Sequence, residues 1–133
     1  MTTVLFACVH NAGRSQLAAA LFAAAADPAR ARALSAGTQP AERVHPEVVA
    51  VLAEVGIDLA ATVPRRLTDE LARQAQLLVT MGCGDACPNL PGLPHEDWQL
   101  VDPKGQTLER VRALRDELQG RVQRLVQEHG WQR

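Results

Sequence analysis

The sequence predicts an α/β protein with four parallel strands in a doubly wound sheet and helices on both faces of that sheet. Two observations predict this class. Short apolar runs suited to strands alternate with longer segments rich in helix-forming residues, and one of these runs is apolar throughout, as is typical of a strand covered on both faces. No repeat, linker or low-complexity segment divides the 133 residues. We therefore expect a single domain over residues 1–133.

The first half of the chain contains two predicted strands and two predicted helices. The first strand covers residues 3–8, and residues 15–26 form a helix with a stripe of leucine and phenylalanine. A short second strand, residues 33–37, is closed by a glycine. The second helix covers residues 46–55, because a proline suits its first turn and a glycine follows its end.

The second half continues the alternation of strands and helices. A cap-like threonine, Thr68, begins a short third helix. Residues 76–81 are the continuously apolar strand, and a loop rich in Gly, Cys and Pro follows at residues 82–94. We predict the fourth strand at residues 98–101 and a long amphipathic helix at residues 107–128.

Composition and charge exclude several classes of protein. The chain is 47% hydrophobic and 22% charged, with a net charge of −1 and no basic face that would predict binding to nucleic acid. No apolar run approaches the roughly 20 residues that span a membrane, and no signal peptide is evident. Three cysteines without an export signal indicate thiol chemistry in a reducing compartment, so we expect a cytoplasmic protein.

An eight-residue segment between the first strand and the first helix carries most of the chemistry. A cysteine stands at the strand end and an arginine six residues later, on a short loop that leads into a helix. Backbone N–H groups and the helix dipole favour an anion there, a guanidinium adds charge-assisted hydrogen bonds, and a thiolate is a nucleophile. These features predict attack on phosphorus or arsenic; a buried structural cysteine beside a solvated arginine is the alternative. The segment is Cys8-Val9-His10-Asn11-Ala12-Gly13-Arg14-Ser15.

The spacing Cys-x5-Arg-Ser resembles the phosphate-binding loop of the low-molecular-weight protein tyrosine phosphatase superfamily, which includes arsenate reductases of the same fold. The resemblance implies that Cys8 is the nucleophile, that Arg14 binds two oxygens of the oxyanion and that Ser15 hydrogen-bonds the sulfur. It also implies that Asn11 braces the loop, and Gly13 suits a backbone folded tightly around an anion. The expected oxyanion-binding residues are Val9, His10, Asn11, Ala12, Gly13 and Arg14.

Asp102-Pro103 follows the predicted fourth strand and matches the general-acid position of the superfamily. An aspartate in that position protonates the departing oxygen; a turn before the last helix is the alternative interpretation of this pair. Two interpretations of His10 also stay open. It is either a spacer within the loop or a base, since Arg14 and the loop can activate the thiol without it.

Two further cysteines favour arsenate reduction over phosphate hydrolysis. A phosphatase of this fold needs one cysteine, whereas the reduction of arsenate takes two electrons from thiols. Cys83 follows the predicted third strand, and Cys87 stands four residues later. The resemblance implies a relay in which Cys83 attacks the Cys8 sulfur, arsenite leaves, and Cys87 receives the disulfide. Lys104 follows the Asp-Pro pair, where tyrosine phosphatases of this fold usually have an aromatic residue.

The sequence does not identify the electron donor. The relay implies thioredoxin, but the spacing between Cys83 and Cys87 is shorter than in the familiar relay. The segment also resembles reductases that use a small thiol, mycothiol or glutathione, with a glutaredoxin-like or mycoredoxin-like protein. We expect no tightly bound cofactor and no metal, because zinc on Cys83, Cys87 and His95 would lack its fourth ligand.

The sequence therefore predicts an arsenate reductase of the phosphatase fold, with Cys8, Arg14 and Asp102 in the reaction and the two later cysteines as the relay. One alternative is a low-molecular-weight protein tyrosine phosphatase that hydrolyses phosphomonoesters through a phosphocysteine. The other is a non-catalytic oxyanion or redox sensor, which would bind an oxyanion without forming product.

Overall fold

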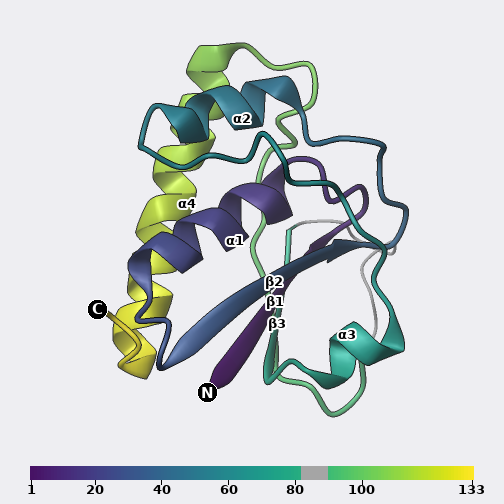
Figure 1. The fold of residues 1–133 in the computed structure, drawn as a ribbon, viewed down its shortest axis with the longest axis vertical. Helices are drawn as coiled ribbons and strands as arrows, with labels where there is room; N and C mark the ends of the chain where they lie inside the picture. The colour runs from purple at the N-terminus through teal and green to yellow at the C-terminus, as the bar shows by residue number, and fades with distance from the viewer. Residues whose placement is uncertain (82–89) are drawn as a thin grey trace.

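A computed structural model describes residues 1–81 and 90–133 of the chain. Within these ranges four parallel strands form one sheet in the order β2-β1-β3-β4, which confirms the predicted fold class. Figure 1 labels β2, β1 and β3 of this sheet. The strands are β1 (Thr2–Cys8), β2 (Ala31–Gly37), β3 (Leu77–Thr80) and β4 (His95–Asp97). β1 has a neighbour on each side, so Cys8 lies at the carboxyl end of an interior strand.

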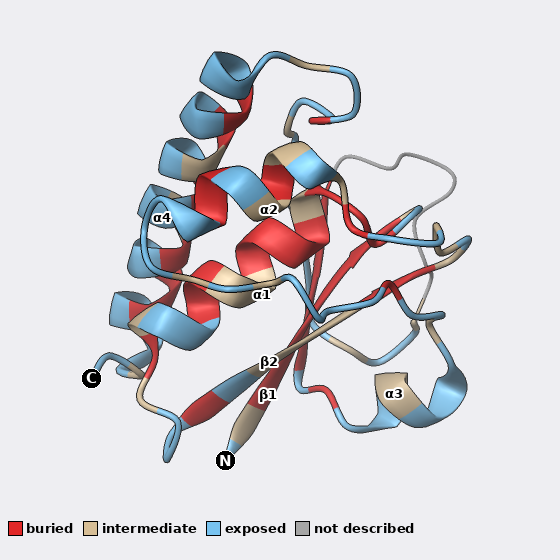
Figure 2. Ribbon diagram, turned by 45° about the horizontal axis from the view of Figure 1, so that its top comes forward, coloured by how far each residue is buried: buried red, intermediate tan, exposed pale blue. Residues whose placement is uncertain are grey.

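The helices cover the two faces of the sheet unequally. Three of them pack on one face, and the short α3 packs on the other (Figure 1). Figure 2 shows that the buried residues of α1 and α4 lie along the sides of these helices that face the sheet. The helices are α1 (Arg14–Ala25), α2 (Pro46–Ala53), α3 (Asp69–Arg73) and α4 (Leu108–His129). No helix in the described ranges combines the length and the apolar character needed to cross a bilayer.

The side chains of β1 alternate between two separate cores. Val4, Phe6 and Cys8 join the larger core beneath α1, α2 and α4, whereas Leu5 and Ala7 join the smaller core beneath α3. A strand covered on both faces needs apolar residues at every position, which explains why residues 4–8 of β1 are all apolar.

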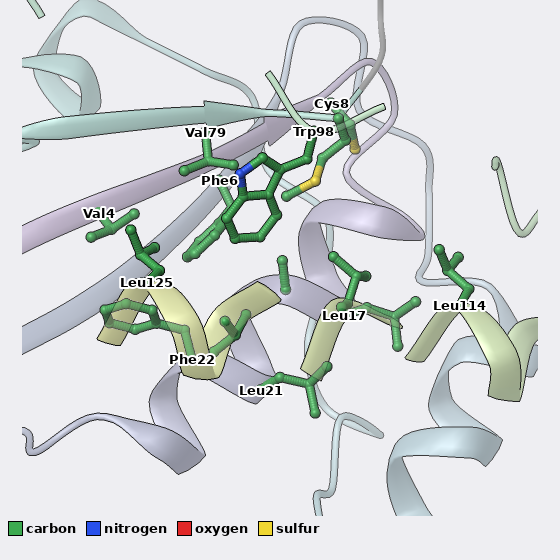
Figure 3. Packing of buried hydrophobic residues seen from close by; sticks show 14 of the residues in the cluster. Val4, Phe6, Cys8, Leu17, Leu21, Phe22, Val79, Trp98, Leu114 and Leu125 are labelled. Carbon is green, nitrogen blue, oxygen red and sulfur yellow. The ribbon is translucent and has the colours of Figure 1, made fainter. Parts of the chain in front are cut away.

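Aromatic rings meet at the centre of the larger core. The ring of Phe6 lies 5.7 Å from that of Phe22 and 6.0 Å from that of Trp98 between centroids, in tilted geometries (Figure 3). Phe6 and Phe22 are fully buried and Trp98 is 6% exposed. Such aromatic pairs add specific edge-to-face attraction to the burial of apolar surface. The contact with Phe6 fixes the position of Trp98, the first residue of the segment that leads to Asp102.

The predicted fourth strand was misplaced. The structure has β4 at residues 95–97, where His95 pairs with Leu78 and Asp97 with Thr80. This strand is at the sheet edge and its side chains are exposed, so polar residues suffice there and no apolar run marks it. The run at residues 98–101 is apolar because Trp98 packs into the core beyond the last strand pairing. The other predicted elements agree with the structure to within one or two residues.

A cluster of charged side chains connects α2 to α4. The Glu54 carboxylate follows the last residue of α2 and accepts from Arg112 Nε at 2.9 and 3.0 Å and from Arg115 Nη1 at 2.8 Å. Hydrogen bonds from these two guanidinium groups lower the pKa of Glu54 from 4.5 to about 2. Because the pKa is lower in the folded protein, this contribution to stability is fully present above pH 4.5 and is lost as the pH falls towards 2.

We expect Glu54→Gln to lower the midpoint of urea unfolding slightly at pH 7, since exposed ion pairs contribute little. The difference from the unaltered protein should shrink below pH 4.5 and disappear near pH 2. Urea titrations at several pH values measure it. Glu117→Gln is the matched control, because it removes a longer ion pair, 3.7 Å to Arg121, within α4. An effect of Glu54→Gln that is independent of pH would contradict the assignment.

Candidate active site

The candidate site lies at the carboxyl end of β1, where ligands bind in open α/β sheets. β1 ends at Cys8 and α1 begins at Arg14, so the loop between them is five residues long. Cys8 pairs with Gly37 of β2, and the preceding Ala7 pairs with Thr80 of β3. The loop at residues 9–13 is therefore flanked by the ends of both neighbouring strands.

The carbonyl groups of this loop are held by the chain that follows β2. The carbonyl of Val9 accepts from the N–H of Gln39 at 2.8 Å, and that of His10 accepts from Ala41 at 2.9 Å. The carbonyl of Ala12 likewise accepts from the N–H of His45 at 2.9 Å. In the described part of the chain, the N–H groups of residues 9–13 donate to no acceptor. Together with the N-terminus of α1 they can bind an anion.

Gly37 makes this close approach possible. A Cβ atom at Gly37 would lie 2.5 Å from the carbonyl oxygen of Val9 and 2.9 Å from the backbone nitrogen of Asn11. Both neighbours are backbone atoms, which cannot move aside as a flexible side chain can. A glycine at the end of β2 is therefore required for the loop to lie against this strand.

Asn11 has a left-handed backbone, with φ of 51°. This conformation is uncommon for residues other than glycine, although asparagine adopts it more readily than most, and it must be held by its surroundings. Asn11 is fully buried, and its Oδ1 accepts from the N–H of Arg65 at 3.0 Å. Because a backbone N–H can only donate, this bond fixes which side-chain atom of Asn11 is the oxygen. Its Nδ2 therefore donates to Ser15 Oγ, at 2.8 Å.

The Ser15 hydroxyl links this network to the thiol. Its Oγ lies 2.8 Å from Cys8 Sγ, and Cys8 is 3% exposed. Since Ser15 Oγ accepts from Asn11, its single proton is available to donate to the sulfur. Donation from this hydroxyl to the sulfur stabilises the thiolate form of Cys8.

Arg14 connects three segments at the sheet end. Its Nη1 donates to the carbonyl of Met81 at 2.5 Å and to that of Leu100 at 3.0 Å. Its Nη2 lies 4.0 Å from Asp102 Oδ2. The two carbonyls fix the plane of the guanidinium. Nε and Nη2 donate no hydrogen bond within residues 1–81 and 90–133, so both can donate to an oxyanion.

The Asp102-Pro103 pair packs directly against the loop. A Cβ atom at Gly13 would lie 2.6 Å from Pro103 Cγ and 3.3 Å from His45 Cδ2, so Gly13 leaves the space that this contact occupies. Asp102 Oδ1 accepts from the N–H of Lys104 at 3.0 Å, as in a turn, while Oδ2 faces Arg14. Asp102 therefore takes part in a turn and also lies beside Arg14 of the candidate site.

The remaining predicted residues are placed as follows. The exposed ring of His10 lies with Nδ1 3.0 Å from the carbonyl oxygen of Gln39, and since a carbonyl accepts, Nδ1 carries a proton. Cys83 and Cys87 lie outside the described residues. Residues 1–81 and 90–133 contain no cluster of three or more His, Cys, Asp or Glu side chains suited to a metal ion.

Sequence reasoning missed Gln16 and Arg65. The side chain of Gln16 is 4% exposed and donates to both oxygens of Asn11. A buried glutamine directly after the Arg-Ser pair, on the inner side of a helix, is a signal that could have identified it. Arg65 acts through its backbone N–H, 54 residues from Asn11, and no side-chain pattern reveals that contact.

A parallel α/β sheet with a buried cysteine, free loop amides and an arginine at the end of its first strand is the arrangement of enzymes that attack an oxyanion with a thiolate. The family model described as low molecular weight phosphotyrosine protein phosphatase matches residues 3–132. The chain belongs to this family.

Known relatives differ in the reactions that their names state. The chain is 35% identical to the glutaredoxin arsenate reductase of Synechocystis, over 95% of this chain and 97% of the relative. A thioredoxin-dependent arsenate reductase of Corynebacterium glutamicum is 39% identical, with a TM-score of 0.81; the match covers 96% of this chain but 61% of that one. An arginine phosphatase of Geobacillus stearothermophilus is 29% identical, with a TM-score of 0.81, over 98% of this chain and 94% of that chain.

Gly37→Ala should destabilise the protein by about 1–3 kcal/mol, because the added Cβ forces the backbone of the loop to move. Gly120→Ala, in the middle of α4, is the matched control. In the described part of the chain, no atom beyond the adjoining residues and the backbone of its own helix lies within 4 Å of the added Cβ, and removing a helical glycine should stabilise by about 0.5–1 kcal/mol. Urea unfolding measures both changes. If the two substitutions changed the free energy of unfolding equally, the space at Gly37 would not exclude a side chain and the prediction would be wrong.

Proposed function

We propose that this chain is an arsenate reductase that converts arsenate into arsenite and so serves arsenic detoxification. The observation that carries the proposal is the hydrogen bond of 2.8 Å between Cys8 and Ser15, beside a loop of amides that have no other partner in the described part of the chain. The relatives named as arsenate reductases, at 35% and 39% identity, support arsenate as the substrate.

The first step forms a bond between sulfur and arsenic. The Cys8 thiolate, stabilised by the Ser15 hydroxyl, attacks arsenic, and a hydroxyl group of the arsenate takes a proton from Asp102 and leaves as water. Arsenic stays in the +5 state. The loop amides and Arg14 bind the remaining oxygens and offset their negative charge.

The second step carries the reduction. A second thiolate attacks the Cys8 sulfur, a disulfide forms, and the electron pair of the breaking S–As bond stays on arsenic. Arsenic leaves in the +3 state as arsenite, and the two sulfurs have supplied two electrons. We propose Cys83 as this second thiol and Cys87 as the thiol that takes over the disulfide; an external thiol is the alternative.

A thiol reductant must then reduce the disulfide. The names of the relatives, one thioredoxin-dependent and one a glutaredoxin arsenate reductase, support a protein donor of this general kind. We propose thioredoxin, or a glutaredoxin-like protein together with glutathione or mycothiol, as the donor.

Phosphomonoester hydrolysis is the second candidate function. The family description, low molecular weight phosphotyrosine protein phosphatase, supports it, because phosphotyrosine is a phosphomonoester. The arginine phosphatase of Geobacillus stearothermophilus, with the same fold at 29% identity, supports phosphate hydrolysis in general. Hydrolysis requires Cys8, Arg14 and Asp102 but no second thiol, since water attacks the phosphocysteine. A weak phosphatase activity is therefore expected beside the reductase activity.

Cys8→Ser should reduce arsenite formation to background, because the hydroxyl is a far weaker nucleophile at neutral pH. Cys83→Ser should stop turnover with thioredoxin while it spares a weak hydrolysis of an aryl phosphate. Arsenite is measured with thioredoxin, with glutaredoxin and glutathione, and with mycothiol and mycoredoxin, each supplied separately. Mass spectrometry of the disulfides identifies the resolving thiol. The proposal is wrong if both variants reduce arsenate at the parental rate with every donor.

Asp102→Asn should slow hydrolysis of phenyl phosphate by roughly a hundredfold or more, because an asparagine cannot donate the proton that the leaving oxygen needs. Hydrolysis of p-nitrophenyl phosphate should fall less, since its leaving group is a weaker base. Asp116→Asn, at an exposed aspartate of α4 that pairs with Arg115, is the control and should leave both rates unchanged. Equal losses with the two substrates would argue against Asp102 as the acid.

A further inference from the structure

Four consecutive carbonyl groups of the loop are held by donors from outside the loop. Those of Val9, His10 and Ala12 accept from backbone N–H groups in the chain that follows β2. The carbonyl of Asn11 differs, because its donor is a side chain, Gln16 Nε2, at 3.0 Å. Gln16 is therefore the one donor of this set that a substitution can remove.

Each of these donors also directs an N–H group. A peptide unit is planar and trans, so its C=O and N–H point in opposite directions. A donor that holds the carbonyl of one residue thereby sets the direction of the N–H of the next residue. Gln16 in this way directs the N–H of Ala12, one of the loop amides available to an oxyanion.

The same side chain acts on the thiol by a second route. Gln16 Nε2 also lies 3.0 Å from Asn11 Oδ1, the atom that accepts from the N–H of Arg65. With its oxygen held by these two donors, Asn11 presents Nδ2 to Ser15, and Ser15 is in contact with Cys8. The sequence of contacts thus runs from Gln16 to the sulfur through two side chains.

We propose that Gln16 is a positioning residue that couples the binding of the oxyanion to the activation of Cys8. It contacts neither directly. Its buried amide holds Asn11 in the left-handed conformation at φ 51°, and this one conformation serves both the Ala12 N–H and the Ser15 hydroxyl. The inference rests on the proposed role of Cys8 as the nucleophile, and it holds for arsenate and phosphate alike.

Loss of this donor should have two consequences together. The Asn11 carbonyl, in a fully buried residue, would lack a partner, and the peptide unit would be free to rotate. The Ala12 N–H would then leave the anion site, and Nδ2 of Asn11 would move away from Ser15. Removal of the Ser15 hydroxyl should weaken the activation of Cys8 and leave the binding of the oxyanion largely unchanged.

Alkylation of Cys8 by iodoacetamide, with inorganic phosphate as the protecting anion, tests the proposal. Trypsin cleaves after Arg14, so mass spectrometry follows Cys8 on a peptide that holds no other cysteine. In Gln16→Met we expect alkylation at pH 7 to slow, and the phosphate concentration for half protection to rise about tenfold. In Ser15→Ala alkylation should slow, while protection by phosphate changes much less.

Gln76→Met is the matched control. Gln76 accepts from the N–H of Thr3 at 2.7 Å, at the opposite end of β1, so its substitution removes a glutamine side-chain hydrogen bond to β1 far from the loop. This variant should keep both the alkylation rate and the protection of the unaltered protein. The proposal is overturned if Gln16→Met matches Gln76→Met in both measurements.

A measurement on the unaltered protein covers the case in which Gln16→Met fails to fold. The ¹⁵N–¹H signals of the Gln16 side-chain amide should exchange slowly with solvent and should shift when phosphate is added. Rapid exchange with no response to phosphate would overturn the proposal. A response, in a protein that reduces arsenate with none of the donors, would uphold the inference while the proposed function fails.

Discussion

The conformation of one short loop depends on where its carbonyl groups are held. If the carbonyls of residues 9–12 turned inward, the site would repel an oxyanion; the chain after β2 and Gln16 hold them outward. Much of the fold serves this arrangement. The strand order puts β2 beside β1, so the segment that leaves β2 runs along the loop. Gly37 then allows the two backbones to approach closely enough for hydrogen bonds.

Arg14 connects this first half of the chain with the second. An arginine has five N–H donors in a rigid plane, so it can bind protein carbonyls and an oxyanion at the same time, which a lysine cannot do in a fixed geometry. Here one nitrogen binds the carbonyls of Met81 and Leu100, which lie after β3 and β4. The orientation of the guanidinium is therefore set by the ends of the sheet. The packing of Pro103 on Gly13 holds the Asp102 turn in the same region.

The sequence was sufficient for those features that depend on local patterns. The Cys8-to-Ser15 spacing, the apolar run of β1 and the capped helices are contiguous in the chain, and the structure has the predicted elements within one or two residues. The prediction failed for β4, because an exposed edge strand carries no apolar signal and Trp98 is buried for another reason. The contact of Arg65 with Asn11 spans 54 residues and uses backbone atoms, so no residue pattern encodes it. The expectations for Cys83 and Cys87 fall outside the described residues and stay predictions.

The aromatic composition gives the molecule an optical property. The chain has no tyrosine and two tryptophans, so its near-ultraviolet emission arises from two indoles. Trp131 is stacked on His129 just beyond α4, with ring centroids 4.3 Å apart. Trp98 is buried against Phe6, two positions before Leu100, whose carbonyl binds the guanidinium of Arg14. The fluorescence of Trp98 therefore reports, without any attached label, on the segment from Trp98 to Leu100 that contacts Arg14.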